Sequence, residues 1–186
     1  MAYYGLSNPW IAKLDPETSK YLEGFKCGTA VGTEVNPQYN ESKLYGDNVL
    51  QESLKEFKYA DVTLTTTSMP IEAANVVFGH TIDKTKKSIV YNASDEANYV
   101  GYGFFASEMI NGKATYIAAV LPKVKFSEGT ESYTTKGDSI EFKTPSLSGN
   151  AMADATGNWK KKQTFDTEAE AIAYIKKELN ITDEAA

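Results

Sequence analysis

Very few side chains in this sequence are suited to catalysis or metal binding. The chain has one histidine, His80, and one cysteine, Cys27, far apart in sequence. A structural zinc site needs four such ligands, so a single chain cannot complete one. His80 follows the predicted end of a short helix, which is typical of a capping imidazole rather than a catalytic base. Cys27 lies in a strand pattern, which is typical of a small core residue rather than a nucleophile.

No motif for an enzyme is present either. The sequence contains no calcium-binding EF-hand loop, no glycine-rich phosphate loop with its lysine, and no serine elbow. Gly101 and Gly103 flank Tyr102 within a predicted strand, where glycines typically allow an aromatic ring or a neighbouring backbone to approach. We therefore expect no enzymatic activity, no cofactor and no metal.

Length and composition indicate one soluble domain, residues 1–186. The hydrophobic fraction is 41% and the charged fraction 24%, ordinary values for a globular protein. No window approaches the apolar length that a membrane-spanning helix requires, and the N-terminus has no secretory signal pattern. The single cysteine suits synthesis in a reducing cytoplasm. We expect no association with membranes.

The charge pattern argues against specific nucleic-acid binding. The net charge is −6, and all 19 basic residues are lysine. Arginine is the residue that grips phosphate in bidentate fashion and reads guanine edges, so an acidic chain without it is an atypical nucleic-acid reader. An acidic surface would instead suit a protein along which DNA moves without binding to it.

The pattern of the chain predicts a mainly β fold. After an irregular N-terminal arm, residues 1–22, predicted strands cover residues 25–34, 60–67, 88–92, 99–107, 114–126, 137–144 and 158–165. Asn111-Gly112 predicts a two-residue hairpin, and Pro122 predicts a bend or an edge position. This order of elements favours an antiparallel β-sandwich or a partly open β-barrel, with a short flanking helix and a C-terminal helix.

Two helices are predicted beside these strands. Ser68 can cap a short helix that Gly79 ends, with an apolar stripe formed by Ile71, Ala74, Val77 and Phe78. The second helix covers residues 166–180. Thr167 and Glu170 form a capping box at its start. Its predicted buried stripe consists of Ala169, Ile172, Ile175 and Leu179.

Residues 35–59 form a long polar excursion between two predicted strands. A loop of this size is usually functional or disordered, and this one carries too much apolar surface for a flexible linker. Its apolar side chains must be buried against their own domain or against a neighbouring molecule. Both alternatives are compatible with the sequence.

Several short segments resemble a known family when they are taken together. They are Leu44-Tyr45-Gly46-Asp47-Asn48, Ala60-Asp61-Val62-Thr63-Leu64 and the segment from Phe142 to Gly149, with Tyr4-Gly5-Leu6-Ser7-Asn8 and the segment from Leu121 to Phe126. In order and spacing, the chain resembles the major tail proteins, or tail tube subunits, of long non-contractile-tailed bacteriophages. The resemblance covers nearly the whole chain.

This resemblance implies a structural virion protein that self-assembles. Subunits would form hexameric rings, and stacked rings would form a tube through which the genome passes during ejection. The implied partners are further copies of the chain and the tape measure, tail terminator and distal tail proteins, and the implied location is the virion tail. Two alternatives stay open: a monomeric carbohydrate-binding β-sandwich with Trp10 or Trp159 as a platform, and a terminator or distal ring of the same tail.

The long excursion is the expected self-assembly loop. Its expected contact residues are Tyr39, Leu44, Tyr45, Gly46, Asp47 and Leu50. An arm that reaches the next ring would explain why the segment is both extended and partly apolar.

Overall fold

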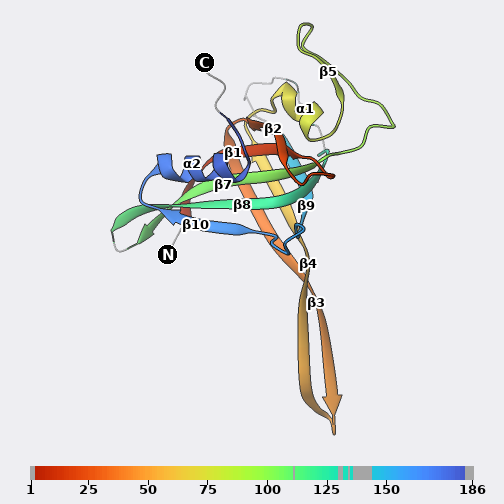
Figure 1. The fold of residues 1–186 in the computed structure, drawn as a ribbon, viewed down its shortest axis with the longest axis vertical. Helices are drawn as coiled ribbons and strands as arrows, with labels where there is room; N and C mark the ends of the chain where they lie inside the picture. Colours follow the sequence, from red (N-terminus) through yellow and green to blue (C-terminus); the bar gives the residue numbers. More distant parts are fainter. Residues whose placement is uncertain (1–2, 111, 130–131, 134, 136–143, 183–186) are drawn as a thin grey trace.

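One antiparallel sheet organises the computed structural model, which describes residues 3–110, 112–129, 132–133, 135 and 144–182. The strand order is β2-β1-β7-β8-β9-β4-β3, and β10 also pairs with β8 (Figure 1). The strands are β1 (Tyr3–Leu14), β2 (Tyr21–Lys26), β3 (Ala30–Gly46), β4 (Val49–Thr66), β7 (Tyr99–Ile110), β8 (Lys113–Ser127), β9 (Ser146–Met152) and β10 (Lys161–Phe165). The predicted mainly β, antiparallel fold is confirmed, and the sheet is open rather than closed.

The two halves of strand β8 pair with different strands along one of its edges. Its first half pairs with β10, with Val120 opposite Lys161, and its second half pairs with β9, with Lys123 opposite Met152. Pro122 lies where the neighbour changes, and the register with β7 shifts at the same place. The predicted bend at Pro122 is therefore confirmed. The edge position is wrong, because β8 has a neighbour on each side.

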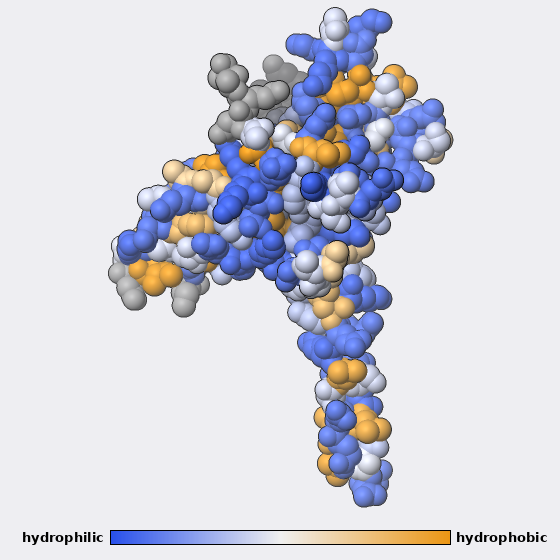
Figure 2. Space-filling model, viewed as in Figure 1, coloured by the Kyte–Doolittle hydropathy of each residue, from blue (hydrophilic) through white to orange (hydrophobic). Residues whose placement is uncertain are grey.

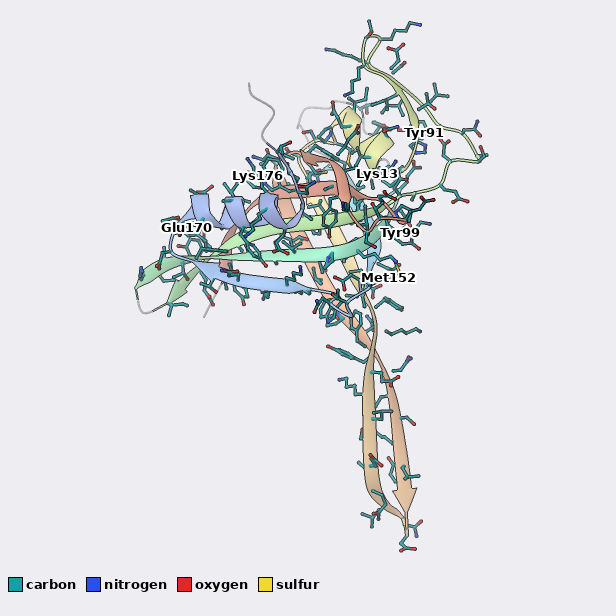
Figure 3. All side chains as sticks on the ribbon, in the orientation of Figure 1. Lys13, Tyr91, Tyr99, Met152, Glu170 and Lys176 are labelled. Atoms are coloured by element: carbon teal, nitrogen blue, oxygen red, sulfur yellow. The ribbon has the colours of Figure 1, made fainter. Side chains whose placement is uncertain are left out.

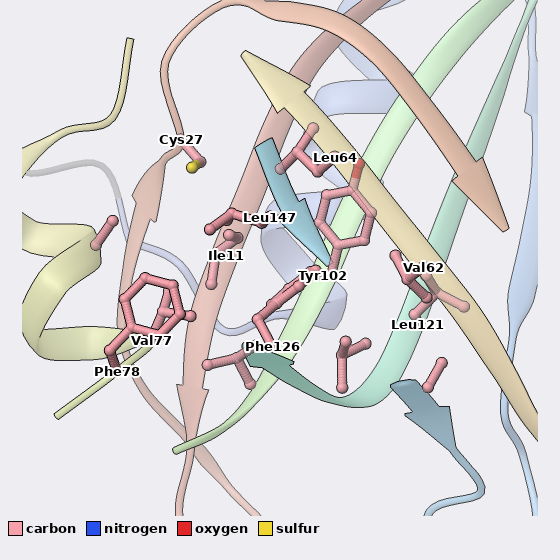
Figure 4. Packing of buried hydrophobic residues seen from close by; sticks show 14 of the residues in the cluster. Ile11, Cys27, Val62, Leu64, Val77, Phe78, Tyr102, Leu121, Phe126 and Leu147 are labelled. Atoms are coloured by element: carbon pink, nitrogen blue, oxygen red, sulfur yellow. The ribbon is translucent and has the colours of Figure 1, made fainter. Parts of the chain in front are cut away.

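The inner core lies between β1, β7 and β8 on one side and β4 and β9 on the other. Figure 4 shows Tyr102 at its centre, among Leu64, Leu147 and Phe126. The Tyr102 hydroxyl donates a hydrogen bond to Thr33 Oγ1 at 2.9 Å, so this buried polar group is satisfied. Cys27 is fully buried in the same cluster, which confirms the predicted core role, and burial raises the pKa of its thiol to about 12.

The opposite face of β7 and β8 is covered by helix α2 (Glu168–Glu178). The predicted capping box is confirmed, since Glu170 N–H donates to Thr167 Oγ1 and Thr167 N–H donates to Glu170 Oε2. Ile175 and Leu179 are buried as predicted, but the stripe passes through Ala171, and Ala169 is exposed. The buried residues follow the i, i+4, i+8 spacing 171, 175 and 179, which leaves Ala169 on the exposed side of the first turn.

The two glycines beside Tyr102 allow this helix to lie close to the sheet. A methyl group on Gly101 would lie 2.5 Å from atoms of both Tyr21 and Leu179, and one on Gly103 would lie 2.5 Å from Ile175. The predicted close approach of an aromatic ring is therefore confirmed at Gly101.

The predictions for residues 1–22 and 25–34 are wrong. Residues 1–22 are not an irregular arm, because β1 pairs with both β2 and β7, and its register shifts around Asn8 and Pro9 accommodate the irregular sequence. Residues 25–34 are not one strand, because Gly28 has a φ of +63° and turns the chain from β2 into β3. The predicted strand at 137–144 lies almost entirely outside the described residues.

A small excursion follows β4. It contains α1 (Ile71–Val76) and a two-stranded sheet of β5 (Thr81–Asp83) and β6 (Ser88–Val90). Pro70 is the N-cap of α1, so the predicted cap at Ser68 is wrong. Gly79, with a φ of +78°, follows the helix end as predicted.

Candidate functional site: the β3–β4 arm

Residues 35–59 belong to a β-hairpin and are not a loop, which corrects the sequence-based expectation. Strands β3 and β4 stay paired along the whole segment, from Val35 opposite Val62 to Gly46 opposite Val49. In Figure 1 this arm, defined here as residues 38–58, projects clear of the rest of the molecule. Nothing among the described residues packs against its outer half, so the alternative in which the segment folds back on its own domain is wrong.

The turn at the end of the arm explains why a hairpin forms. Asp47 and Asn48 have φ angles of +50° and +62°. Two consecutive residues with positive φ form the turn whose twist matches that of paired strands, and Asp and Asn tolerate this conformation better than other non-glycine residues. The Gln51 side chain donates to the Gly46 carbonyl at 3.3 Å and supports the turn.

Aromatic rings anchor the base of the arm. Tyr39 packs edge-on against Phe57, with ring centroids 6.1 Å apart, and Phe57 stacks on Trp159 of the body at 4.7 Å. Lys55 Nζ lies 4.6 Å from the centre of the Tyr39 ring. Tyr39, one of the expected contact residues, therefore belongs to the base of the arm, where it helps to fix the direction of the hairpin.

The outer part of the arm carries apolar side chains on both faces. Leu44, Val49 and Leu54 share one face, because each lies on alternate positions of the paired strands, and Tyr45 lies opposite Leu50 on the other. All five are exposed, with Leu44 at 61% and Tyr45 at 63%. Figure 2 shows these apolar patches along the arm, separated by hydrophilic residues. We call these five residues the arm tip.

The structure brings most of the expected contact residues together. Leu44, Tyr45, Gly46, Asp47 and Leu50 all lie at the end of the arm. The expected set did not include Val49 and Leu54, whose place in the apolar tip follows only from the pairing register. If Asp47-Asn48 is taken as a hairpin turn, the pairing register that follows from it predicts the positions of Val49 and Leu54 as well.

A second polar cluster lies around His80. Its imidazole is buried and contacts Asp95 through Nδ1, at 2.6 Å, and Glu128 through Nε2. The Tyr91 ring packs on it at 4.4 Å. Sequence analysis missed this cluster, because the two carboxylates lie 15 and 48 residues away. The predicted capping role is wrong, since both ring nitrogens are engaged by carboxylates.

This cluster ties the small excursion to the sheet. Asp95 lies in the excursion, whereas Glu128 follows β8. A groove of about 500 Å³ lies beside them, and Lys125 and the Tyr99 and Met152 side chains labelled in Figure 3 line it. No group of three or more acidic, histidine or cysteine side chains in the described part of the chain is arranged to hold a metal ion. Because the cluster joins two segments that are distant in the sequence through His80, we call it a structural latch.

Burial opposes the charge on His80, but the hydrogen bonds that the imidazolium donates to the Asp95 and Glu128 carboxylates outweigh it and raise the pKa of the imidazole. A raised folded-state pKa stabilises the protein fully below about pH 6.5, the ordinary histidine value, and this contribution is lost as pH rises through the folded-state pKa. We expect the melting temperature of the wild type to fall by about 3 °C more between pH 6 and pH 9 than that of His80→Gln, since a charge-assisted hydrogen bond is worth roughly 1.5 kcal/mol.

Thermal unfolding followed by circular dichroism across this pH range measures the difference. Because His80 is the only histidine, no second imidazole contributes to it. Parallel pH profiles for the two proteins would contradict the latch.

The two tryptophans proposed as sugar platforms pack against the protein itself. Trp159 stacks on Phe57 at the arm base, and Trp10 is partly buried against the α2 cluster with its indole Nε1 shielded from solvent. A lysine ammonium also lies near each ring: Lys160 Nζ is 5.6 Å from the centre of the Trp159 ring, and Lys176 Nζ is 4.9 Å from that of Trp10.

Comparison with known proteins adds no identification. No protein-family model matches the chain, and a search of curated proteins found no match. In the described part of the chain, no helix is long and apolar enough to cross a membrane.

Proposed function

We propose that the chain is a structural subunit that assembles with copies of itself into stacked rings, which form the tail tube of a long-tailed bacteriophage. The observation that carries the proposal is the arm, which holds five exposed apolar side chains clear of the body. The resemblance of the sequence to tail tube subunits is the reason for proposing a tail tube rather than another assembly.

The energetics of the arm favour a partner. Burying the exposed parts of Leu44, Tyr45 and their three neighbours would stabilise an interface by on the order of 5 kcal/mol. Because these side chains occupy both faces, one flat surface cannot cover them, so the tip has to insert between two surfaces. Insertion into a second molecule is the arrangement that buries them all.

The composition supports a role as a conduit for DNA. With a net charge of −6 and no arginine, each subunit offers few groups that would bind phosphate tightly. A lumen built from such subunits would let DNA slide. The tape measure, terminator and distal tail proteins are the further partners that this role implies, and the virion tail is its location.

Negative-stain electron microscopy of the concentrated wild-type protein tests the proposal. Hollow tubes of uniform width are the expected result. Single rings that never stack would instead favour the terminator or distal ring of the same tail. Only monomers at every concentration and salt condition tried, together with saturable binding on a glycan array, would overturn the proposal in favour of the carbohydrate-binding alternative.

A further inference from the structure

A groove of about 430 Å³ lies on the face of the sheet opposite α2. Its floor is formed by side chains of β7 and β8 that alternate with those facing the helix: Phe104, Ala106, Ile117 and Ala119. Tyr3 and Tyr4 of β1 and Val31 of β3 form its exposed rim. Lys162 of β10 completes the lining.

This groove is the uncovered part of the inner sheet face. Strands β4 and β9 cover the neighbouring part, where Leu64 and Leu147 are buried in the core. The part of the face that β4 and β9 cover ends at Thr33 of β3. Thr33 accepts the Tyr102 hydrogen bond and also lines the groove. Beyond Thr33 the apolar floor and the rim have no covering strand among the described residues. The exposed apolar side chains of Tyr3, Tyr4 and Val31 gathered around this floor are a feature that interaction sites share.

We propose that the groove receives the arm tip of a second copy of the chain, an inference that rests on the proposed function. The tip and the groove rim are apolar and exposed, and the groove floor is apolar and partly buried. Their charges are opposite as well: Lys43, Asp47 and Glu52 leave residues 43–53 of the arm with a net charge of −1, whereas Lys162 at the groove is basic. A hairpin that enters the groove would have the β7–β8 floor on one face and the rim residues on the other, which suits a tip that is apolar on both faces.

The groove cannot receive the arm of its own molecule. Thr33 at the groove and Gly46 at the end of the arm lie on the same strand, β3, about 40 Å apart at roughly 3.3 Å per residue. The arm extends away from the body along its whole length (Figure 1). Tip and groove are different surfaces, so in the proposed rings and tube each copy would place its tip on one neighbour and receive the tip of another, and the contact would repeat from copy to copy. Two copies that exchange tips would form a closed dimer instead, and the crosslinking test below separates the two arrangements.

Disulfide crosslinking tests the assignment directly. The test protein carries Val31→Cys at the groove rim and Ser53→Cys on the arm, next to Leu54, where serine to cysteine leaves the five tip side chains in place. The native Cys27 is buried and its thiol pKa is raised to about 12, so it does not interfere. Under mild oxidation at assembling concentrations, we expect a ladder of covalent oligomers on a denaturing gel, because every copy can be linked to two others.

The matched control carries Val90→Cys with Ser53→Cys. Val90 lies on β6, away from the groove, and is 61% exposed, against 54% for Val31. This protein should give no ladder, and the single Ser53→Cys variant should give at most dimers. A ladder in the Val90 control, or none in the Val31 variant while tubes still form, would overturn the groove assignment and leave the proposed function standing.

A blocking variant gives an independent readout. Ala106→Trp should fill the floor of the groove and raise the critical concentration for assembly at least tenfold, measured by sedimentation, while Val90→Trp should leave it unchanged. Normal assembly of a folded Ala106→Trp protein would overturn the assignment. If the wild-type protein itself does not assemble, the proposed function fails, and the groove assignment fails with it.

Discussion

Replacing Leu44 and Tyr45 with serine is expected to abolish assembly and leave the subunit folded. The two residues lie on opposite faces of the arm tip, so the double change removes apolar surface from both sides. At about 1.5 kcal/mol for each side chain, the loss per contact is roughly 3 kcal/mol, or more than a hundredfold in affinity. A ring repeats the contact, so the critical concentration should rise beyond what can be reached experimentally.

The folded state should hardly change, because neither side chain contacts the body. The melting temperature should stay within about 2 °C of the wild type, since exposed substitutions typically change stability by less than about 0.5 kcal/mol. The matched control is Leu22→Ser with Val90→Ser, which removes two exposed apolar side chains from the body. Tubes of normal length from the tip variant, or loss of tubes in the control, would contradict the role of the tip.

The second large effect is expected from Gly149→Ala in β9. A methyl group there would lie 2.4 Å from the Lys125 carbonyl oxygen and 2.8 Å from the Phe126 Cα. Both are backbone atoms of β8, so the strands would have to separate. We expect a loss of about 3 kcal/mol, which corresponds to a fall in melting temperature of roughly 6 to 12 °C.

This substitution acts on the connection between the arm and the body. Strand β9 pairs with β8 on one side and with β4 on the other, so it joins the arm strands to the rest of the sheet. Gly32→Ala in β3 is the control, because a methyl group there meets no atom within 4 Å. Equal melting temperatures for the two variants, measured by calorimetry, would contradict the tight β8–β9 packing.

Local patterns in the sequence predicted the parts of the fold that depend on local chemistry. The pairing of Ile110 with Lys113 is the one that the Asn111-Gly112 sequence predicted, although residue 111 itself lies outside the described residues, and the start of α2 follows from the pairing of Thr167 with Glu170. The arm was missed for a physical reason. Its charged and polar residues lack strand alternation, and its pairing is specified mainly by the positive φ angles of Asp47 and Asn48.

Features that depend on distant pairing could not be predicted. Strand β1 contains Gly5 and Pro9, which weaken a strand pattern, and it is held in place by β2 and β7 on its two sides. The groove is lined by five strands, and only the curvature of the sheet brings Val31 near Ala119. The acid partners of His80 are likewise set by tertiary packing.

Because the arm precedes β10 in the sequence, the ribosome completes the arm before it completes the groove. The arm is complete once Lys58 has left the ribosome, whereas the groove needs Lys162 of β10. At 5 to 20 residues per second, roughly 5 to 20 s separate the two events. If tip and groove form the proposed contact, a nascent chain in this interval would be able to donate its tip to a finished neighbour but not to accept one. An assembly that takes up a nascent chain would therefore stop growing at that chain. The time needed to synthesise each copy would delay polymerisation until the copy is complete.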